Sequence, residues 1–202
     1  MTDIIYRYNH QIYFNITNKC PCRCKFCIRN NGDSVGEASN LWFKQEPSLE
    51  AIYEAIEAFD FTGRTEVVFC GYGEPTMALE KLIAVSAYMR KKVPGIRVRL
   101  NTNGLSDLIH KSSTAEEICG AVDSVSISLN MPDAASYNEI VRPAYGMKSF
   151  DAMLKFAADC QKYLEDVRFT VVDIIGVENV KKSQELAESL GIPLRVREYS
   201  AD

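Results

Sequence analysis

Hydrophobic and polar residues alternate along several short runs of this chain, and longer segments with helical spacing separate the runs. Alternation at every second residue is typical of a β-strand. The pattern predicts six strands: Ile12–Thr17, Glu66–Gly71, Arg97–Asn103, Ser124–Asn130, Val167–Ile174 and Leu194–Tyr199. Strands that alternate with helices predict a parallel sheet with right-handed crossover connections.

The segments between these runs repeat apolar residues every three or four positions, as amphipathic helices do. We expect five helices: one that follows a Ser48 cap, one from Leu79 to Met89, one that a Thr114–Glu117 capping box opens and that runs to Val122, one from Phe150 to about Tyr163, and one from Val180 to Leu190. Six strand–helix units are too few for a closed eight-stranded barrel. The predicted fold class is therefore α/β, a partial (β/α)6 TIM-like barrel with parallel strands, open on one side.

The polar positions of the strands share one parity. In the fourth predicted strand the apolar residues Val125, Ile127 and Leu129 alternate with Ser126, Ser128 and their polar neighbours. If the apolar parity packs on the helices, the polar parity faces a common interior, and that interior requires water or a polar ligand. We interpret it as an internal chamber. The alternative is a sheet with helices on one face and solvent on the other.

Composition and charge exclude several classes of protein. The chain has 202 residues, 47% of them hydrophobic and 25% charged, which fits a single globular domain over residues 1–202. The net charge is −4, and no long basic run suggests nucleic-acid binding. No apolar stretch approaches the roughly 20 residues of a membrane span, and no signal peptide opens the chain. Clustered cysteines without such a signal indicate a metal and a reducing cytoplasm.

The cysteines carry the most specific chemistry. Cys20, Cys24 and Cys27 have the spacing C-x3-C-x2-C, with Phe26 before the last one. Three thiolates on one loop can hold three irons of a cubane cluster and leave the fourth iron open to a small molecule. Cys22 lies inside the same loop, so a closed four-sulfur zinc or iron–sulfur site is an alternative.

The other three cysteines, Cys70, Cys119 and Cys160, are dispersed along the chain. Cys160 falls on an apolar helical stripe and is expected to be a buried core thiol.

Further polar motifs follow the predicted strands at their carboxyl ends, where βα barrels place their active sites. The second strand leads into Gly71-Tyr72-Gly73-Glu74-Pro75, a turn whose glycines allow close backbone approach. The third ends at Thr102-Asn103-Gly104, and the fourth ends at Ser128 and Asn130. Arg142 follows in the next connection, either as an anion-binding residue or as an exposed loop arginine.

Together, these motifs resemble the radical S-adenosylmethionine (SAM) superfamily. Cys20, Cys24, Phe26 and Cys27 match its cluster motif, and Gly73-Glu74-Pro75 match its G-G-E-P motif, although Tyr72 replaces the first glycine. The resemblance covers nearly the whole chain, and it looks closest to the subgroup linked with TatD-type metal-dependent hydrolases.

The resemblance implies two cofactors, a [4Fe–4S] cluster on Cys20, Cys24 and Cys27 and S-adenosyl-L-methionine on the open iron. It implies that reductive cleavage of SAM gives a 5′-deoxyadenosyl radical, which abstracts hydrogen from a substrate that the sequence does not identify. The SAM contacts that we expect are Gly71, Tyr72, Gly73, Glu74, Pro75, Thr102, Asn103, Ser128 and Asn130.

The expected partners follow from this chemistry. The enzyme would need a reductant such as flavodoxin or ferredoxin. Because the sequence ends soon after the sixth strand, we expect a side opening, and therefore either a macromolecular substrate or a partner that closes the barrel. The alternative functions are an iron–sulfur electron carrier or redox sensor that does not cleave SAM, and a zinc-bound interaction module.

Overall fold

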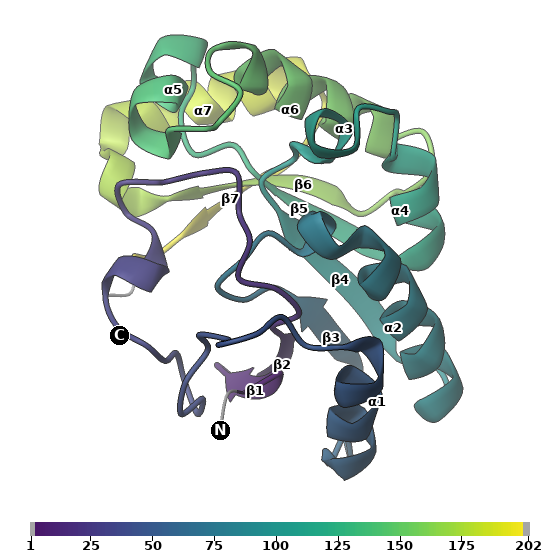
Figure 1. The fold of residues 1–202 in the computed structure, drawn as a ribbon. Coiled ribbons are helices and arrows are strands. Elements are labelled where there is room, and N and C mark those ends of the chain that lie inside the picture. Colours follow the sequence, from purple (N-terminus) through teal and green to yellow (C-terminus); the bar gives the residue numbers. More distant parts are fainter. Residues whose placement is uncertain (1–2, 200–202) are drawn as a thin grey trace.

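The computed structural model describes residues 3–199, in which one curved sheet carries helices on its outer side (Figure 1). The strands are β1 (Ile5–Tyr8), β2 (Gln11–Phe14), β3 (Glu66–Phe69), β4 (Arg97–Thr102), β5 (Ser124–Ser128), β6 (Val167–Val172) and β7 (Leu194–Arg197). Within the described residues these seven strands pair in sequence order, and every pair from β2 to β7 is parallel. The sheet does not close, so the expected partial barrel is confirmed.

The helices fall where the apolar spacing predicts them, with two additions. They are α1 (Leu49–Ala58), α2 (Leu79–Lys92), α3 (Ser106–His110), α4 (Ala115–Ala121), α5 (Ala134–Val141), α6 (Lys148–Cys160) and α7 (Val177–Ser189), with short 3-10 helices η1 (Ile28–Asn30), η2 (Pro75–Ala78) and η3 (Asp173–Ile175). The sequence pattern did not predict α3 and α5, which span only five and eight residues. None of the helices in residues 3–199 combines the length and the apolar character needed to cross a lipid bilayer.

Two local predictions differ from the structure. The sequence did not predict β1, an antiparallel strand that joins β2 through Asn9 and His10, both with positive φ. Positive φ at both central residues is the geometry of the tight hairpin turn that suits twisted strands. The prediction of a capping box at Thr114 is wrong. Helix α4 starts at Ala115 as expected, but the Thr114 hydroxyl does not cap it and instead donates to Asp107 Oδ1 at 2.9 Å.

The apolar parity of the strands packs on the helices. Ile12, Phe14, Leu100, Val125 and Ile127 are fully buried in one continuous core with the inward faces of the helices. At the margin of this core, the stacked rings of Tyr53 and Tyr88 join α1 to α2, with their centroids 4.2 Å apart.

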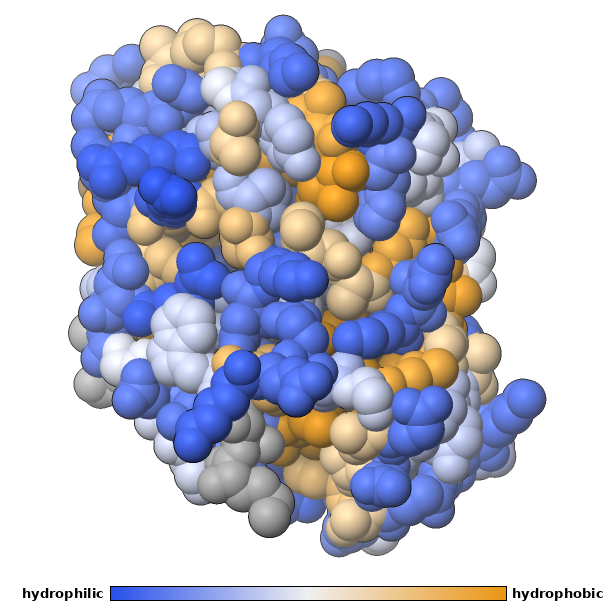
Figure 2. All heavy atoms as spheres, viewed as in Figure 1, coloured by the Kyte–Doolittle hydropathy of each residue, from blue (hydrophilic) through white to orange (hydrophobic). Residues whose placement is uncertain are grey.

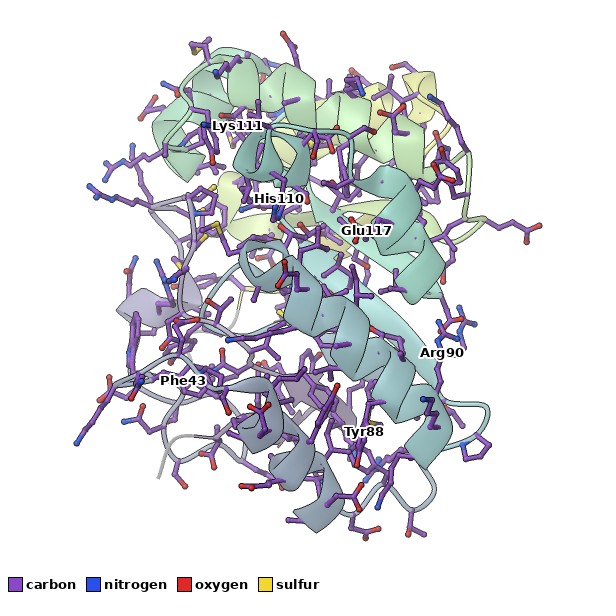
Figure 3. All side chains as sticks on the ribbon, turned by 45° about the vertical axis from the view of Figure 1, so that its right-hand side comes forward. Phe43, Tyr88, Arg90, His110, Lys111 and Glu117 are labelled. Carbon is purple, nitrogen blue, oxygen red and sulfur yellow. The ribbon has the colours of Figure 1, made fainter. Side chains whose placement is uncertain are left out.

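Three labelled side chains mark the two ends of α2. Tyr88 and Arg90 lie near the carboxyl end of α2, and His110 lies near the other end of that helix (Figure 3). A His110 ring nitrogen is 2.8 Å from the Thr76 carbonyl oxygen, so this histidine joins α3 to η2.

The opposite, concave face of the sheet is covered in part by the chain between β2 and α1 (Figure 1). This stretch forms a second, smaller apolar cluster in which Val35, Ala38 and Leu41 pack against Tyr6 and Tyr72. Hydrophilic side chains cover most of the face seen in Figure 1, with apolar residues showing between them in separate patches (Figure 2).

Candidate functional site

The cysteine loop follows β2 at the carboxyl edge of the sheet and is held there by α5. The backbone N–H of Arg23 donates to the Val141 carbonyl at 3.1 Å, and that of Lys25 donates to the Ile140 carbonyl at 2.9 Å. On the other side of the loop, the N–H of Ala144 donates to the Pro21 carbonyl at 2.8 Å. The unpredicted helix α5 therefore fixes the loop that carries the candidate ligands.

Within this loop Cys22 is more deeply buried than the other three cysteines. Cys20, Cys24 and Cys27 are half-buried, whereas Cys22 is 3% exposed. The Cys22 thiol hydrogen-bonds to the Cys20 sulfur, which lowers the pKa of Cys20 and raises that of Cys22. The Asn103 amide also donates to Cys22 Sγ at 3.6 Å. Cys22 is therefore held as a buried thiol behind its neighbours.

The surroundings of the thiols fit an iron–sulfur cluster. Burial and the neighbouring Cys27 and Cys20 raise the pKa of Cys24 to about 12, so thiol groups gather closely at this point. Among the described residues no three Cys, His, Asp or Glu side chains are arranged as ligands of one metal ion. A cubane cluster makes a different demand, because each thiolate binds a different iron.

Tyr137 of α5 supplies a second observation in favour of a bound group. Its hydroxyl is buried and has no hydrogen-bond partner in the part of the chain that the structure describes. Burial raises its pKa, and the thiols of Cys22 and Cys24 raise it further. Buried hydroxyls rarely lack a partner, so an unpaired donor beside the cysteines is what an acceptor such as cluster sulfide would satisfy.

The glycines after β3 are required by packing against the exit of β2. A Cβ on Gly71 would lie 2.3 Å from Asn15 Oδ1, and one on Gly73 would lie 2.2 Å from the Thr17 carbonyl oxygen. Within the described residues no hydrogen bond is made to the carbonyl groups of Gly71, Tyr72 or Gly73. These three oxygens remain available to an amine or another donor.

Glu74 joins the ends of two strands. Its carboxylate accepts hydrogen bonds from the Thr102 hydroxyl at 2.7 Å, the Asn103 N–H at 2.7 Å, and the Thr76 hydroxyl at 2.8 Å. Burial raises the pKa of Glu74, and these hydrogen bonds act against that rise. With Pro75, which opens η2, Glu74 and Thr102 shape the turn from inside the protein.

Tyr72, the departure from the double-glycine motif, anchors the chain that covers the concave face. Its N–H donates to Asn15 Oδ1 at 3.1 Å, and its hydroxyl lies 2.8 Å from the Gly32 carbonyl oxygen and 3.2 Å from that of Ser34. The Trp42 ring meets it edge-on at a centroid distance of 5.0 Å. The Tyr72 side chain thus has a defined packing role.

The remaining predicted contacts lie along the same carboxyl edge of the sheet. Asn130 adopts φ +61°, and its N–H approaches the Thr170 carbonyl on β6. No hydrogen bond of the Ser128 or Asn130 side chain is found among the described residues, so both are free to meet a ligand. Asn103 differs, because its side chain already bonds Cys22 and the N–H of Leu105.

Sequence reasoning missed several residues of this region. Asn15 and Asn18 both donate to the Leu41 carbonyl, at 2.8 and 2.9 Å, and so fix the covering chain to the end of β2. Their position between the end of β2 and the first cysteine was the available signal. A second signal was Asp133, which caps α5, because Asp is a preferred helix N-cap.

Two of the dispersed cysteines lie close together inside the core. The Cys119 Sγ atom is 3.9 Å from the Cys160 carbonyl oxygen.

The protein-family model described as Radical SAM superfamily matches residues 14–190 of this chain. Among curated proteins, the chain is 27% identical over 144 residues to "GTP 3′,8-cyclase 2" of Mycobacterium tuberculosis (strain ATCC 25618 / H37Rv) and 29% identical over 145 residues to "GTP 3′,8-cyclase" of Rhodococcus opacus (strain B4). Each alignment covers 70% of this chain but only 37% and 38% of those proteins.

Solved structures show the same fold. The chain superposes on a histidine-tagged form of the protein anSMEcpe with bound AdoMet, with a TM-score of 0.64 and 21% identity, covering 93% of this chain and 49% of the other. It superposes on a radical SAM methyltransferase from Sphaerobacter thermophilus with a TM-score of 0.55 and 15% identity, covering 96% of this chain and 68% of the other.

Proposed function

Because this chain belongs to the radical SAM superfamily, whose members use a [4Fe–4S] cluster and SAM, we propose that Cys20, Cys24 and Cys27 hold the cluster. When bound, the reduced cluster and SAM supply a 5′-deoxyadenosyl radical that removes a hydrogen atom from the substrate. The observation that carries the assignment is a difference in exposure, because Cys22 is only 3% exposed whereas the other three thiols of the loop are half-buried.

The residues after β3 to β5 would position SAM. The unbonded carbonyl groups of Gly71–Gly73 would accept hydrogen bonds from its amine, and Ser128 and Asn130 would be available to its polar groups from the next strands. Tyr72, Glu74 and Pro75 keep the backbone of this turn in place, and Thr102 and Asn103 bind Glu74 from β4. In this division of roles, the carbonyl groups contact the cofactor and the buried side chains hold them in position.

The narrower expectations stay proposals as well. They are a single domain over residues 1–202, placement in the TatD-linked subgroup, a cytoplasmic location, and a flavodoxin or ferredoxin as reductant. A macromolecular substrate or a closing partner is supported by the exposed β7, where Val196 is 45% exposed. Size-exclusion chromatography and pull-down that find only free monomer, together with turnover of a small metabolite, would contradict that last proposal.

Anaerobic reconstitution tests the assignment directly. After reduction with dithionite, we expect SAM to change the electron paramagnetic resonance signal of the cluster and 5′-deoxyadenosine to form. Cys24→Ala should lose both, whereas Cys22→Ala, its matched control in the same loop, should keep both. An intact cluster that is indifferent to SAM and requires Cys22 would instead indicate an electron carrier or sensor.

A further inference from the structure

A basic pocket of about 430 Å³ lies beside the cysteine loop. Its lining combines four cations with two of the candidate cluster ligands: Arg23, Lys25, Arg29 and Arg142, together with Cys24 and Cys27. No carboxylate belongs to the described lining of this pocket. A local excess of positive charge is unexpected here, because the chain as a whole has a net charge of −4.

The side chains of two of these cations make no hydrogen bond or ion pair within the described part of the protein. Lys25 is paired with Glu139 at 2.6 Å, and the half-buried Arg29 donates to the Asn18 carbonyl. In contrast, Arg23 and Arg142 are exposed, and among the described residues neither guanidinium makes a hydrogen bond or ion pair. Three of the four cations, Arg23, Arg29 and Arg142, therefore form no ion pair among the described residues, and Arg23 and Arg142 are the two whose guanidinium groups are also exposed and without a hydrogen bond.

The backbone fixes both arginines next to the cysteines. Arg23 directly precedes Cys24, and its N–H bonds the Val141 carbonyl at the end of α5. Arg142 ends α5 in the left-handed conformation, with φ +49°. Cys22 and Pro143 form an isolated antiparallel bridge between the two segments. The two charges thus border the cysteine loop on adjoining backbones.

We propose that this pocket is the docking surface for an acidic electron-donor protein, an inference that rests on the proposed function. The argument is charge complementarity at the position where delivery is needed, because Cys24 and Cys27 line the same pocket. In the transfer, the donor is oxidised by one electron and the cluster held by the cysteines is reduced by one, with no proton or leaving group involved. Complementary charges of this kind raise the rate of encounter more than they raise affinity.

Other anionic occupants fit the surface less well. A nucleic acid needs a basic face that follows its backbone, whereas the unpaired charge here is confined to one pocket. A small anion is held best by bidentate arginines, and Arg29 already uses its guanidinium on Asn18 and over the Trp42 ring. The face of a folded acidic partner needs only the exposed charges of Arg23 and Arg142.

The test compares two double variants of the cluster-loaded enzyme. Arg23→Glu/Arg142→Glu reverses the two unpaired charges, and Lys91→Glu/Lys181→Glu makes the same change in net charge on α2 and α7. Reduced flavodoxin, an acidic flavoprotein, is the probe, and cluster reduction is followed by stopped-flow absorbance. We expect the arginine variant to be slower by about tenfold or more at low ionic strength. The lysine variant should stay within about twofold of the wild type.

Two further measurements separate docking from the rest of the enzyme. Reduction by dithionite, a small molecule, should be equally fast in all three proteins, because it does not require docking. Binding of oxidised flavodoxin, measured by titration calorimetry without turnover, should weaken in the arginine variant and in the wild type as salt shortens the Debye length. If dithionite fails to give a SAM-responsive cluster in the wild type, the proposed function is at fault and not the docking surface.

Three results would overturn the docking proposal. One is equal flavodoxin rates in the wild type and the arginine variant. Another is an equal loss in the lysine variant, which would mean that only total charge matters. A third is a charge reversal, in Arg23→Glu/Arg142→Glu, that abolishes the binding of inorganic phosphate or RNA but leaves the binding of flavodoxin unchanged.

Discussion

The two halves of the concave face of the sheet differ in how their polar groups are satisfied. On β2 to β4 and the turns that follow, polar side chains bond other parts of the protein: Asn15 to Leu41, Tyr72 to Gly32, and Glu74 to Thr102. On β5 and β7 no hydrogen bond or ion pair of Ser126, Ser128, Arg195 or Arg197 side chains occurs among the described residues.

Because buried polar groups need partners, this contrast separates two roles. In the first half the protein supplies most of the partners itself, although Asn101 Oδ1 and Arg99 Nε on β4 are buried without a partner among the described residues, and this half holds the turn that we assign to the cofactor. The second half presents polar groups to whatever enters the barrel. Substitutions should therefore lower stability in the first half, and they should leave it nearly unchanged in the second.

The largest effect is expected at Glu74. Its replacement by Ala removes three close acceptor contacts, from the Thr102 hydroxyl, the Thr76 hydroxyl and the Asn103 N–H, and the last two then have no other hydrogen-bond partner among the described residues. We expect the free energy of unfolding to fall by about 3 kcal/mol, measured by anaerobic urea denaturation. Thr170→Val, which removes a single contact of 3.5 Å to Ile127 in the second half, should cost less than about 1 kcal/mol.

The isosteric Glu74→Gln separates charge from shape. The amide keeps one acceptor oxygen but presents N–H groups to donors. The free energy of unfolding should therefore fall by more than in Thr170→Val and by less than in Glu74→Ala. Equal costs for Glu74→Ala and Thr170→Val would remove the distinction between the halves.

Tyr72→Phe should have the next largest effect. It keeps the ring against Trp42 but removes the hydroxyl contact with the Gly32 and Ser34 carbonyls, so we expect a loss of about 1.5 kcal/mol. The change should be concentrated in residues 32–42, where hydrogen exchange should become faster. Tyr163→Phe, at a residue that is 50% exposed, serves as the control and should change neither quantity. Unchanged exchange in residues 32–42 would mean that Tyr72 does not anchor this chain.

The contrast between the halves also marks what the sequence could predict. Alternation along the strands correctly predicted the six parallel strands, and the C-x3-C-x2-C spacing predicted the family. Alternation indicates which parity is polar, but not which polar groups the protein satisfies. The partners of Asn15 and Tyr72 are backbone carbonyls of Leu41 and Gly32, in a stretch with no periodic pattern. The short helix α5 was missed for a similar reason, because eight residues contain too few helical turns for a clear repeat.

Asp133 connects the second half to the cluster loop, and its substitution should have a moderate effect. Its carboxylate caps α5 by accepting from the N–H groups of Ala135 and Ser136, both at 3.0 Å. Asp133→Ala should lower the free energy of unfolding by about 1 kcal/mol. Asp133→Asn, which retains an acceptor oxygen, should recover most of it. A matching loss of cluster occupancy in the Ala variant would show that α5 supports the loop, whereas full occupancy would contradict that role.

The pH dependence of this cap has a defined sign. Hydrogen bonds from the Ser136 hydroxyl and N–H lower the pKa of Asp133 below its ordinary value near 4. A carboxyl whose pKa is lower in the folded state contributes stability that is fully present above its unfolded pKa and is lost as the pH falls through its folded pKa. The difference in stability between the wild type and Asp133→Ala should therefore shrink below about pH 4 and stay constant above it.

The smallest effect is expected at the open edge of the second half. Arg195→Gln/Arg197→Gln removes two exposed charges that no carboxylate pairs with in the described residues. We expect the free energy of unfolding to change by less than about 0.5 kcal/mol, and the response of the cluster signal to SAM to persist. A loss as large as that of Tyr72→Phe would mean that these arginines support the sheet. Near-zero cost would mean that the sheet does not depend on these two side chains, as expected for polar groups of the second half that have no partner within the protein.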